Sequence, residues 1–217
     1  MDKLEEIIEQ IHRSFEIRTR ARDQALKQAR ILTRFSANAI RAVHRNEHEL
    51  AQEHLSKAQS LVDALNQDLN DHPDIYFAGY TQDAMKEFAE ASITYALINH
   101  QSLPMPDVIK VEYNTYLKGL AESAGELRRK CLDILRHGHS EEAESLLNHM
   151  DDIYAVLVTM DYPDAITGGL RRLTDIVRGI TERTRGDLTL SLRQERLEKR
   201  LQAFEKQILE ENERKQE

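Results

Sequence analysis

The chain has 217 residues and a formal net charge of −8, with 40% hydrophobic and 31% charged residues. Four prolines and eight glycines interrupt a sequence dominated by helix-forming residues, so we expect an all-α protein with an aliphatic core. The negative charge excludes indiscriminate binding of nucleic acid, although basic residues can still gather locally. Nothing in the composition argues for two domains, and we expect residues 1–217 to form one.

Cysteine usage and hydropathy indicate the compartment. The single cysteine, Cys131, excludes an internal disulfide framework and suits a reducing environment, where its expected role is core packing. The amino terminus is charged from Asp2 onward, and no apolar run approaches the roughly 18 residues that a membrane span requires. We therefore expect a cytoplasmic protein without a membrane partner.

The first predicted helix runs from about Lys3 to Arg45 without a proline or glycine. Apolar residues such as Leu32 and Ala39 recur along it at helical spacing. On the opposite side a basic stripe falls within a sector about 80° wide; its members are Arg20, Lys27, Arg30, Arg34, Arg41 and Arg45. Such a stripe can follow the phosphates of a nucleic acid, but taken alone it is more often the solvated face of a long helix.

Six further helices are expected, giving seven in all. They cover about residues 46–69, 81–98, 106–137, 140–160, 165–185 and 189–215, with Asn46 and Thr81 as N-caps and residues 75–80 as a packed loop. In the last helix apolar residues are spaced by seven, four, three and four: Leu190, Leu197, Leu201, Phe204 and Ile208. Such a row needs a partner helix, either the first helix or a neighbouring subunit.

Two pairs of glutamates are the main candidates for chemistry. Glu87 and Glu90 lie on a helix that is otherwise apolar or small on nearly every side, which predicts burial. A buried carboxylate costs several kcal/mol unless a cation, a metal or hydrogen-bond donors meet it. Glu122 and Glu126 follow about thirty residues later. Together the four resemble the oxygen ligands that Mg²⁺, Mn²⁺ or Ca²⁺ prefers.

Other interpretations of these residues stay open. Lys118, Arg129 and Asp133 share the side of the helix that carries Glu122 and Glu126, as in a solvated face. Zinc or di-iron sites are disfavoured, because His100 and His137 lie ten and eleven residues beyond the nearest glutamate instead of at ligand spacing. No Gly-rich phosphate loop and no nucleophile beside a base is recognisable.

Four segments carry a resemblance to a known family. Residues Arg30–Arg34 with Ala42–Arg45, then Glu87–Ala91, and then Tyr116–Arg129 are similar to the translin and translin-associated factor X family. The similarity covers most of the chain in order. Its most specific motif is tyrosine-leucine-x-glycine-x-alanine-acid-x-x-glycine-glutamate-leucine-x-arginine, which begins at Tyr116.

The resemblance implies a translin-like helical bundle that assembles into a closed octamer and handles RNA or single-stranded DNA on an internal basic surface. For the factor X branch it implies a Mg²⁺-dependent endoribonuclease whose acidic residues fall on Glu87, Glu90 and Glu122, with Glu126 adjacent. The translin branch has apolar residues at the first two positions, which places this chain nearer the catalytic branch. That branch carries aspartate where this chain has Glu122. The compact chain resembles prokaryotic or archaeal members and implies a homo-oligomer.

The leading hypothesis is therefore an endoribonuclease in which Glu87, Glu90, Glu122 and Glu126 form the catalytic metal site for Mg²⁺, with Mn²⁺ as a substitute. Arg129 and the basic stripe would position phosphates. One alternative is an oligomer that binds RNA or single-stranded DNA without cutting it. Another is a helical scaffold in which the glutamates pair with arginines between subunits.

Overall fold

The computed structural model describes residues 2–138 and 140–214, and all regular structure in this part of the chain is helical. The long helices are α1 (Asp2–His44), α2 (His48–Asp68), α4 (Gly79–Ile98), α6 (Tyr113–Leu135), α7 (Ser140–Val158) and α9 (Leu170–Arg214). Four-residue helices lie in the connections: α3 (Pro73–Tyr76), α5 (Pro106–Ile109) and α8 (Asp164–Thr167). The predicted all-α class is confirmed. None of these helices has a stretch apolar and long enough to cross a bilayer.

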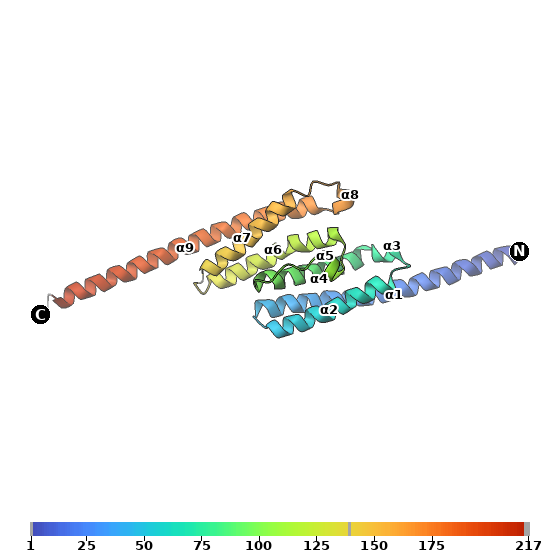
Figure 1. Cartoon of the computed structure of the whole chain (residues 1–217), viewed down its shortest axis with the longest axis horizontal. Helices are drawn as coiled ribbons and strands as arrows, with labels where there is room; N and C mark the ends of the chain where they lie inside the picture. The colour runs from blue at the N-terminus through green and yellow to red at the C-terminus, as the bar shows by residue number, and fades with distance from the viewer. Residues whose placement is uncertain (1, 139, 215–217) are drawn as a thin grey trace.

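The long helices pack side by side, with α4 between α1 and α6. Helix α1 packs against α2 and α4, α4 packs against α6, and α6 packs against α7 and α9 (Figure 1). Each of five helices contributes a fully buried side chain to the core, namely Leu32, Leu65, Phe88, Leu127 and Met150. Helix α4 is buried along most of its length, as its nearly continuous apolar sequence predicts.

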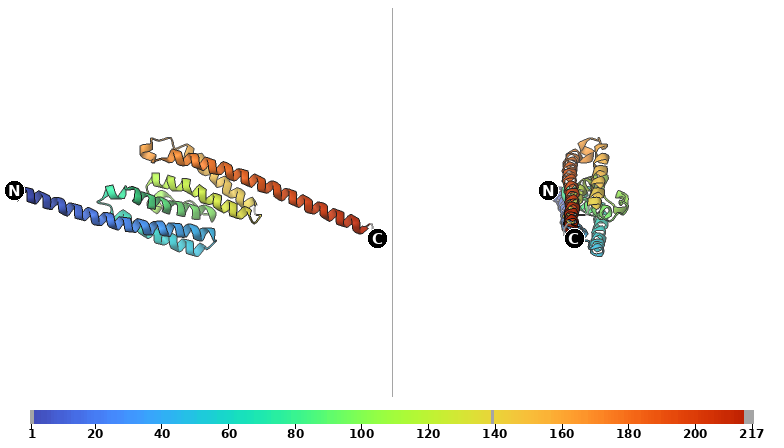
Figure 2. Two further views of the ribbon diagram at one scale, coloured as in Figure 1. Left: turned by 180° about the vertical axis from the view of Figure 1, so that it is seen from behind. Right: turned by 90° about the vertical axis from the view of Figure 1, so that its left-hand side faces the viewer.

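Helices α1 and α9 extend well beyond the bundle, in opposite directions (Figures 1 and 2). Ala25 is the first buried residue described in α1, and Leu188 is the last described in α9. The amino-terminal half of α1 and the carboxy-terminal half of α9 are therefore exposed helices in this chain.

Two predicted helix caps are wrong. Asn46 has a left-handed backbone, with φ 58°, and its side-chain oxygen accepts a hydrogen bond from Lys130 Nζ at 2.7 Å. Helix α2 begins after Glu47 instead. Thr81 lies inside α4, where its hydroxyl donates to the carbonyl of Ile75. Both polar side chains make contacts between segments, which local capping rules do not describe.

Two predicted helix boundaries also differ. The predicted helices over 165–185 and 189–215 are one helix, α9, which passes straight through Gly186. Arg185 pairs with Asp151 of α7, and Asp187 pairs with Arg128 of α6, so tertiary contacts on both sides of the glycine keep the backbone helical. The predicted helix over 106–137 is instead divided at Lys110, whose φ of 55° separates α5 from α6.

A glycine sets the close approach of α4 and α6. Gly119 lies directly against α4, where an added methyl group would be 2.8 Å from both the Cβ of Ala89 and the backbone nitrogen of Glu90. Real side chains essentially never approach so closely, so the crossing requires glycine at this position. Because α4 is held by its own packing on α1, a larger residue would push α6 away.

We predict that Gly119→Ala lowers the free energy of unfolding by about 1 to 3 kcal/mol, because overpacking forces the two backbones apart. Urea unfolding followed by circular dichroism measures the change. Gly125→Ala in the same helix is the matched control. Its added methyl group meets no atom within 4 Å, so it should leave stability unchanged or raise it by up to about 1 kcal/mol. Equal effects of the two substitutions would contradict the tight crossing.

Candidate functional site

The crossing of α4 and α6 brings together three glutamates that lie far apart in the sequence. Glu87 and Glu90 come from α4, and Glu122 comes from α6, three residues after Gly119. One carboxylate oxygen from each lies within 4.8 Å of one from each of the others. Glu90 is buried, with 9% of its surface exposed, while Glu87 and Glu122 are about a third exposed. We call these three residues the glutamate cluster; it has one buried and two solvent-accessible members.

A lysine side chain lies in the glutamate cluster. Lys86 Nζ is 2.7 Å from one oxygen of Glu122, 2.8 Å from the other, and 3.4 Å from Glu87. Burial opposes the charge of Lys86, but the hydrogen bond and charge of Glu122, together with Glu87, raise the pKa of its ammonium group. The space between the carboxylates therefore already attracts a positive charge.

Glu90 is the member of the cluster whose ionised form is disfavoured most. Burial, followed by the negative charges of Glu87, Glu122 and Glu126, raises the pKa of Glu90 from 4.5 to about 8. Lys86 opposes this shift only partly. At neutral pH Glu90 is therefore largely protonated, and a further cation is needed to ionise it.

Glu126 lies beside the cluster and has a partner of its own. Its Oε2 is 2.5 Å from Nε2 of His44, at the end of α1, and 3.7 Å from Arg129. The hydrogen bond from His44 lowers the pKa of Glu126 although burial raises it. The structure thus brings together three of the four predicted ligands and holds the fourth, Glu126, against α1.

The predicted basic residues lie on the solvent side of α1. All six members of the stripe are exposed, as is Arg129. Some make local contacts: Arg20 is 3.7 Å from Glu16, and Arg41 donates to Asn38 at 2.8 Å. Because His44 contacts Glu126, the last turn of α1, which includes Arg41, lies next to Glu126, one turn of α6 beyond Glu122. The carboxy-terminal end of the stripe therefore lies on the same helix as His44, which contacts Glu126.

Sequence reasoning did not identify two residues of this site. Lys86 precedes Glu87 directly, and a lone lysine on an otherwise buried helix was a usable indication of an internal ion pair. His44 was recognised only as part of a motif. Its contact with Glu126 joins positions 82 residues apart, which spacing within a helix cannot predict.

The glutamate cluster fits a divalent cation of the Mg²⁺ or Mn²⁺ type. Oxygen ligands of Mg²⁺ lie about 2.1 Å from the ion and so about 3 to 4 Å from one another. The separation of up to 4.8 Å closes to this range with small side-chain rotations. Two exposed carboxylates leave room for water or a phosphate oxygen as further ligands, and the ammonium group of Lys86 marks the position that a cation favours.

Comparison with known proteins shows the family of this chain. No family model matches the chain. An uncharacterized protein of Methanocaldococcus jannaschii is 33% identical over 184 residues, covering 83% of this chain and 80% of the relative. The structure of AfC3PO is 30% identical with a TM-score of 0.78, covering 85% of this chain and 96% of AfC3PO. The chain belongs to the translin and translin-associated factor X family. The family predicted from the sequence motifs is thereby confirmed.

Two further structures are informative about this translin-family fold. AfC3PO has also been solved as a complex with duplex RNA, and that structure aligns with a TM-score of 0.77 at 30% identity, covering 85% of this chain and 95% of the other. The structure of apo-NeC3PO aligns with a TM-score of 0.78 at 19% identity, over 85% and 96% of the two chains, and supports the fold alone. The archaeal relative fits the predicted prokaryotic or archaeal origin.

We predict that the pKa of Glu90 makes stability depend on pH. Because folding raises this pKa from 4.5 to about 8, the folded state retains a proton that the unfolded state releases over this range. The stabilisation is complete below pH 4.5 and is lost as the pH rises through 8. Glu90→Gln removes the dependence, so at pH 9 in EDTA it should be more stable than the unsubstituted protein by about 2 to 4 kcal/mol.

Urea unfolding at pH 5 and pH 9 measures this difference. Asp83→Asn, which removes an exposed carboxylate two turns before Glu90 on the same helix, is the control and should show no comparable pH dependence. A gap between Glu90→Gln and the unsubstituted protein that is equal at the two pH values would rule out the proposed protonation of Glu90.

Proposed function

We propose that the protein is an RNA-binding homo-oligomer that hydrolyses RNA at the glutamate cluster with Mg²⁺. The observation that carries the proposal is the meeting of Glu87, Glu90 and Glu122 at the α4–α6 crossing, with their oxygens within 4.8 Å. Membership of a family in which AfC3PO has been solved with duplex RNA supports RNA as the substrate. The exposed basic stripe on α1, the helix whose His44 contacts Glu126, supports a path for the phosphate backbone.

In this proposal the residues of the site have separate roles. Glu87, Glu90 and Glu122 would hold the ion, which supplies charge neutralisation at the phosphate and a lowered pKa for water. Lys86, which pairs with Glu122 and Glu87, would have to leave them for the ion to be held there, and its ammonium group could then pair with a phosphate. Glu126 stays charged beside the site through His44, and Arg129 with the stripe positions the substrate. Hydrolysis adds water across one phosphorus–oxygen bond.

Cleavage of fluorescent RNA, single-stranded and as a short duplex, tests the proposal in Mg²⁺ and in EDTA. We expect Mg²⁺-dependent cutting that falls by at least about 100-fold in the double variant Glu87→Gln, Glu90→Gln. Asp83→Asn, on the same helix but outside the cluster, should keep the full rate. Cleavage that survives the double substitution would contradict the assignment.

A second function, binding without cleavage, is favoured by one specific observation. Lys86 already pairs with Glu122 and Glu87, so the cluster can exist as an internal ion pair without a metal. In that case RNA binds equally well in Mg²⁺ and in EDTA and is not cut.

Both functions predict that the basic stripe binds RNA. Replacing Arg30, Arg34 and Arg41 with glutamine should weaken RNA binding and reduce its salt dependence, while replacing Arg171, Arg172 and Arg183 of α9 should not.

A further inference from the structure

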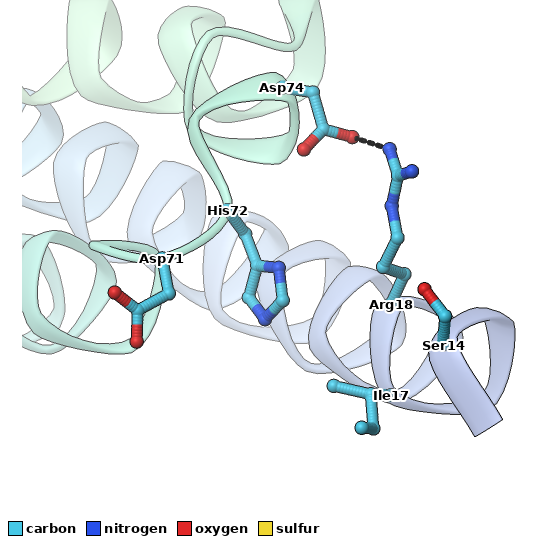
Figure 3. Close-up of a pocket in the computed structure, with 6 residues that line it drawn as sticks. All are labelled: Ser14, Ile17, Arg18, Asp71, His72 and Asp74. Atoms are coloured by element: carbon cyan, nitrogen blue, oxygen red, sulfur yellow. Dashed lines mark hydrogen bonds and ion pairs between the residues drawn. The ribbon is translucent and has the colours of Figure 1, made fainter. Parts of the chain in front are cut away.

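Helices α1 and α9 both extend beyond the bundle, and these extensions are the largest unexplained feature of the molecule. Helix α1 stays tied to the bundle as far as Arg18, which pairs with Asp74 at 2.5 Å beside the start of α3 (Figure 3). In α9 the last buried residue described is Leu188, and the described side chains after Leu192 are exposed except for the half-buried Glu195. Beyond these points neither helix packs against the bundle (Figures 1 and 2).

The α9 extension carries one row of large apolar side chains that its own chain leaves uncovered. At about 100° per residue, this row lies on the side of α9 opposite Leu188, which packs into the core. The row, which we call the α9 seam, is 42 to 62% exposed and consists of Leu190, Leu197, Leu201, Phe204 and Ile208. Its spacing of seven, four, three and four residues is that of a coiled-coil core, so the seam needs a partner helix.

The partner of the α9 seam lies in another molecule. Both views place the α1 and α9 extensions at opposite ends of the bundle (Figures 1 and 2), so the chain's own first helix cannot reach the seam. Of the two partners that the sequence allowed, the first helix of the same chain is therefore excluded. A neighbouring copy offers two exposed apolar rows, one on its α1 extension and one on its α9 extension.

The charges that border the α9 seam differ from one side to the other. When Leu197 is placed at heptad position d and Leu201 at position a, arginines occupy the g positions and glutamates occupy the e positions. The arginines are Arg193 and Arg200, and the glutamates are Glu198 and Glu205. All four side chains are exposed, and none of them has a hydrogen bond or ion pair within the described part of the chain.

A second α9 helix complements both borders of the seam. In a parallel pair each g residue faces the e residue of the following heptad on the partner, which brings Arg193 opposite Glu198 and Arg200 opposite Glu205. Because the two helices carry the same residues, each of these pairs forms twice. An antiparallel pair would set g against g and e against e, so arginine would face arginine and glutamate would face glutamate. The charges therefore favour the parallel direction.

The α1 extension complements the α9 seam less well. Its apolar row is Leu4, Ile8, Ile11 and Phe15, with Glu5 and His12 at the e positions and Ile7 and Ser14 at the g positions. Glu5 is the one acid among these bordering residues, so an α1 extension placed in parallel on α9 gains at most one ion pair, with an arginine. Two α1 extensions gain none. A second α9 therefore forms the largest number of ion pairs with the α9 seam.

We propose that the α9 seam of one copy packs in parallel and in register on the α9 seam of a second copy of this chain. The inference rests on the homo-oligomer of the proposed function and identifies one contact that builds it. Both copies use the same surface, so the contact has two-fold symmetry and closes on itself as a pair. Gln194 lies at a core position between Leu190 and Leu197, where it faces its counterpart, and a polar residue at one such position fixes the register.

Disulfide trapping at two levels of the seam tests the contact and its direction. Chains with Leu190→Cys are mixed with chains carrying Ile208→Cys and oxidised; Cys131, the one natural cysteine, is buried. We expect cross-links between two Leu190→Cys chains and between two Ile208→Cys chains, because the two positions lie about 27 Å apart along the helix. Ala203→Cys, exposed on the same helix but off the seam, is the matched control and should cross-link at least about tenfold more slowly.

The identity of the products decides between the partners. A main product that joins Leu190→Cys to Ile208→Cys would show an antiparallel pair and overturn the proposal. So would a main product with Ile8→Cys, added as a third chain, because the α1 extension would then occupy the seam. An oligomer, shown by sedimentation of the unsubstituted protein, in which no cross-link forms would also overturn it. A monomeric sedimentation coefficient would contradict the homo-oligomer and this contact together, while Mg²⁺-dependent RNA cleavage is measured separately.

Charge reversal tests the ion pairs beside the seam. Arg193→Glu with Arg200→Glu leaves only glutamates at the four bordering positions, and Glu198→Arg with Glu205→Arg leaves only arginines. Each double variant, made in the Leu190→Cys chain, should cross-link about tenfold more slowly at low salt, because every pair becomes repulsive. Mixing the two double variants should restore the rate, because every pair in the mixed dimer is attractive.

A control with the same change of charge separates these pairs from a general effect. Arg196→Glu with Lys206→Glu reverses two exposed charges on the same helix, away from the seam, and should leave the rate of cross-linking unchanged within about twofold. Equal rates for the separate and the mixed double variants would contradict the proposed pairing.

Discussion

The burial of Glu90 is the constraint on which the candidate site depends. A carboxyl group inside a helical bundle, with Glu87 and Glu122 beside it, is stable only if it keeps a proton or meets a cation. Lys86 supplies part of this positive charge. Its ammonium group bridges Glu87 and Glu122, but the pKa of Glu90 is still about 8. Lys86 alone does not supply enough positive charge to keep Glu90 ionised at neutral pH. A divalent ion between the three carboxylates would supply it.

The fold maintains this constraint through the close contact of two helices. Gly119 lets α6 approach the backbone of α4 at Glu90, and Glu122 follows one turn later. Helix α1 closes the third side, where His44 holds Glu126 and so fixes a further negative charge near Glu90. The same helix carries the basic stripe on its exposed side. One helix thus connects the site and the proposed RNA path.

Much of this organisation could be predicted from the sequence, and the failures have physical reasons. The apolar sequence around Glu87 and Glu90 predicted a buried helix, and the motif around Glu122 predicted the family. The contact of Glu126 with His44 and the ion pairs of Lys86 could not be predicted, because they depend on how distant helices cross. Two helices were predicted over 165–185 and 189–215, whereas contacts of Arg185 and Asp187 with other helices keep α9 continuous between them. Local patterns describe single helices, and the site arises between them.

We propose that the glutamate cluster binds a divalent cation in exchange for the ammonium group of Lys86 and the proton of Glu90. A crystal structure with Mn²⁺ at pH 8, with the ion located by its anomalous scattering, tests this most directly. We expect one ion contacted by oxygens of Glu87, Glu90 and Glu122, with Lys86 Nζ withdrawn from Glu122. Crystals in which Lys86 still bridges Glu87 and Glu122 at saturating Mn²⁺, with no ion between the three carboxylates, would contradict it.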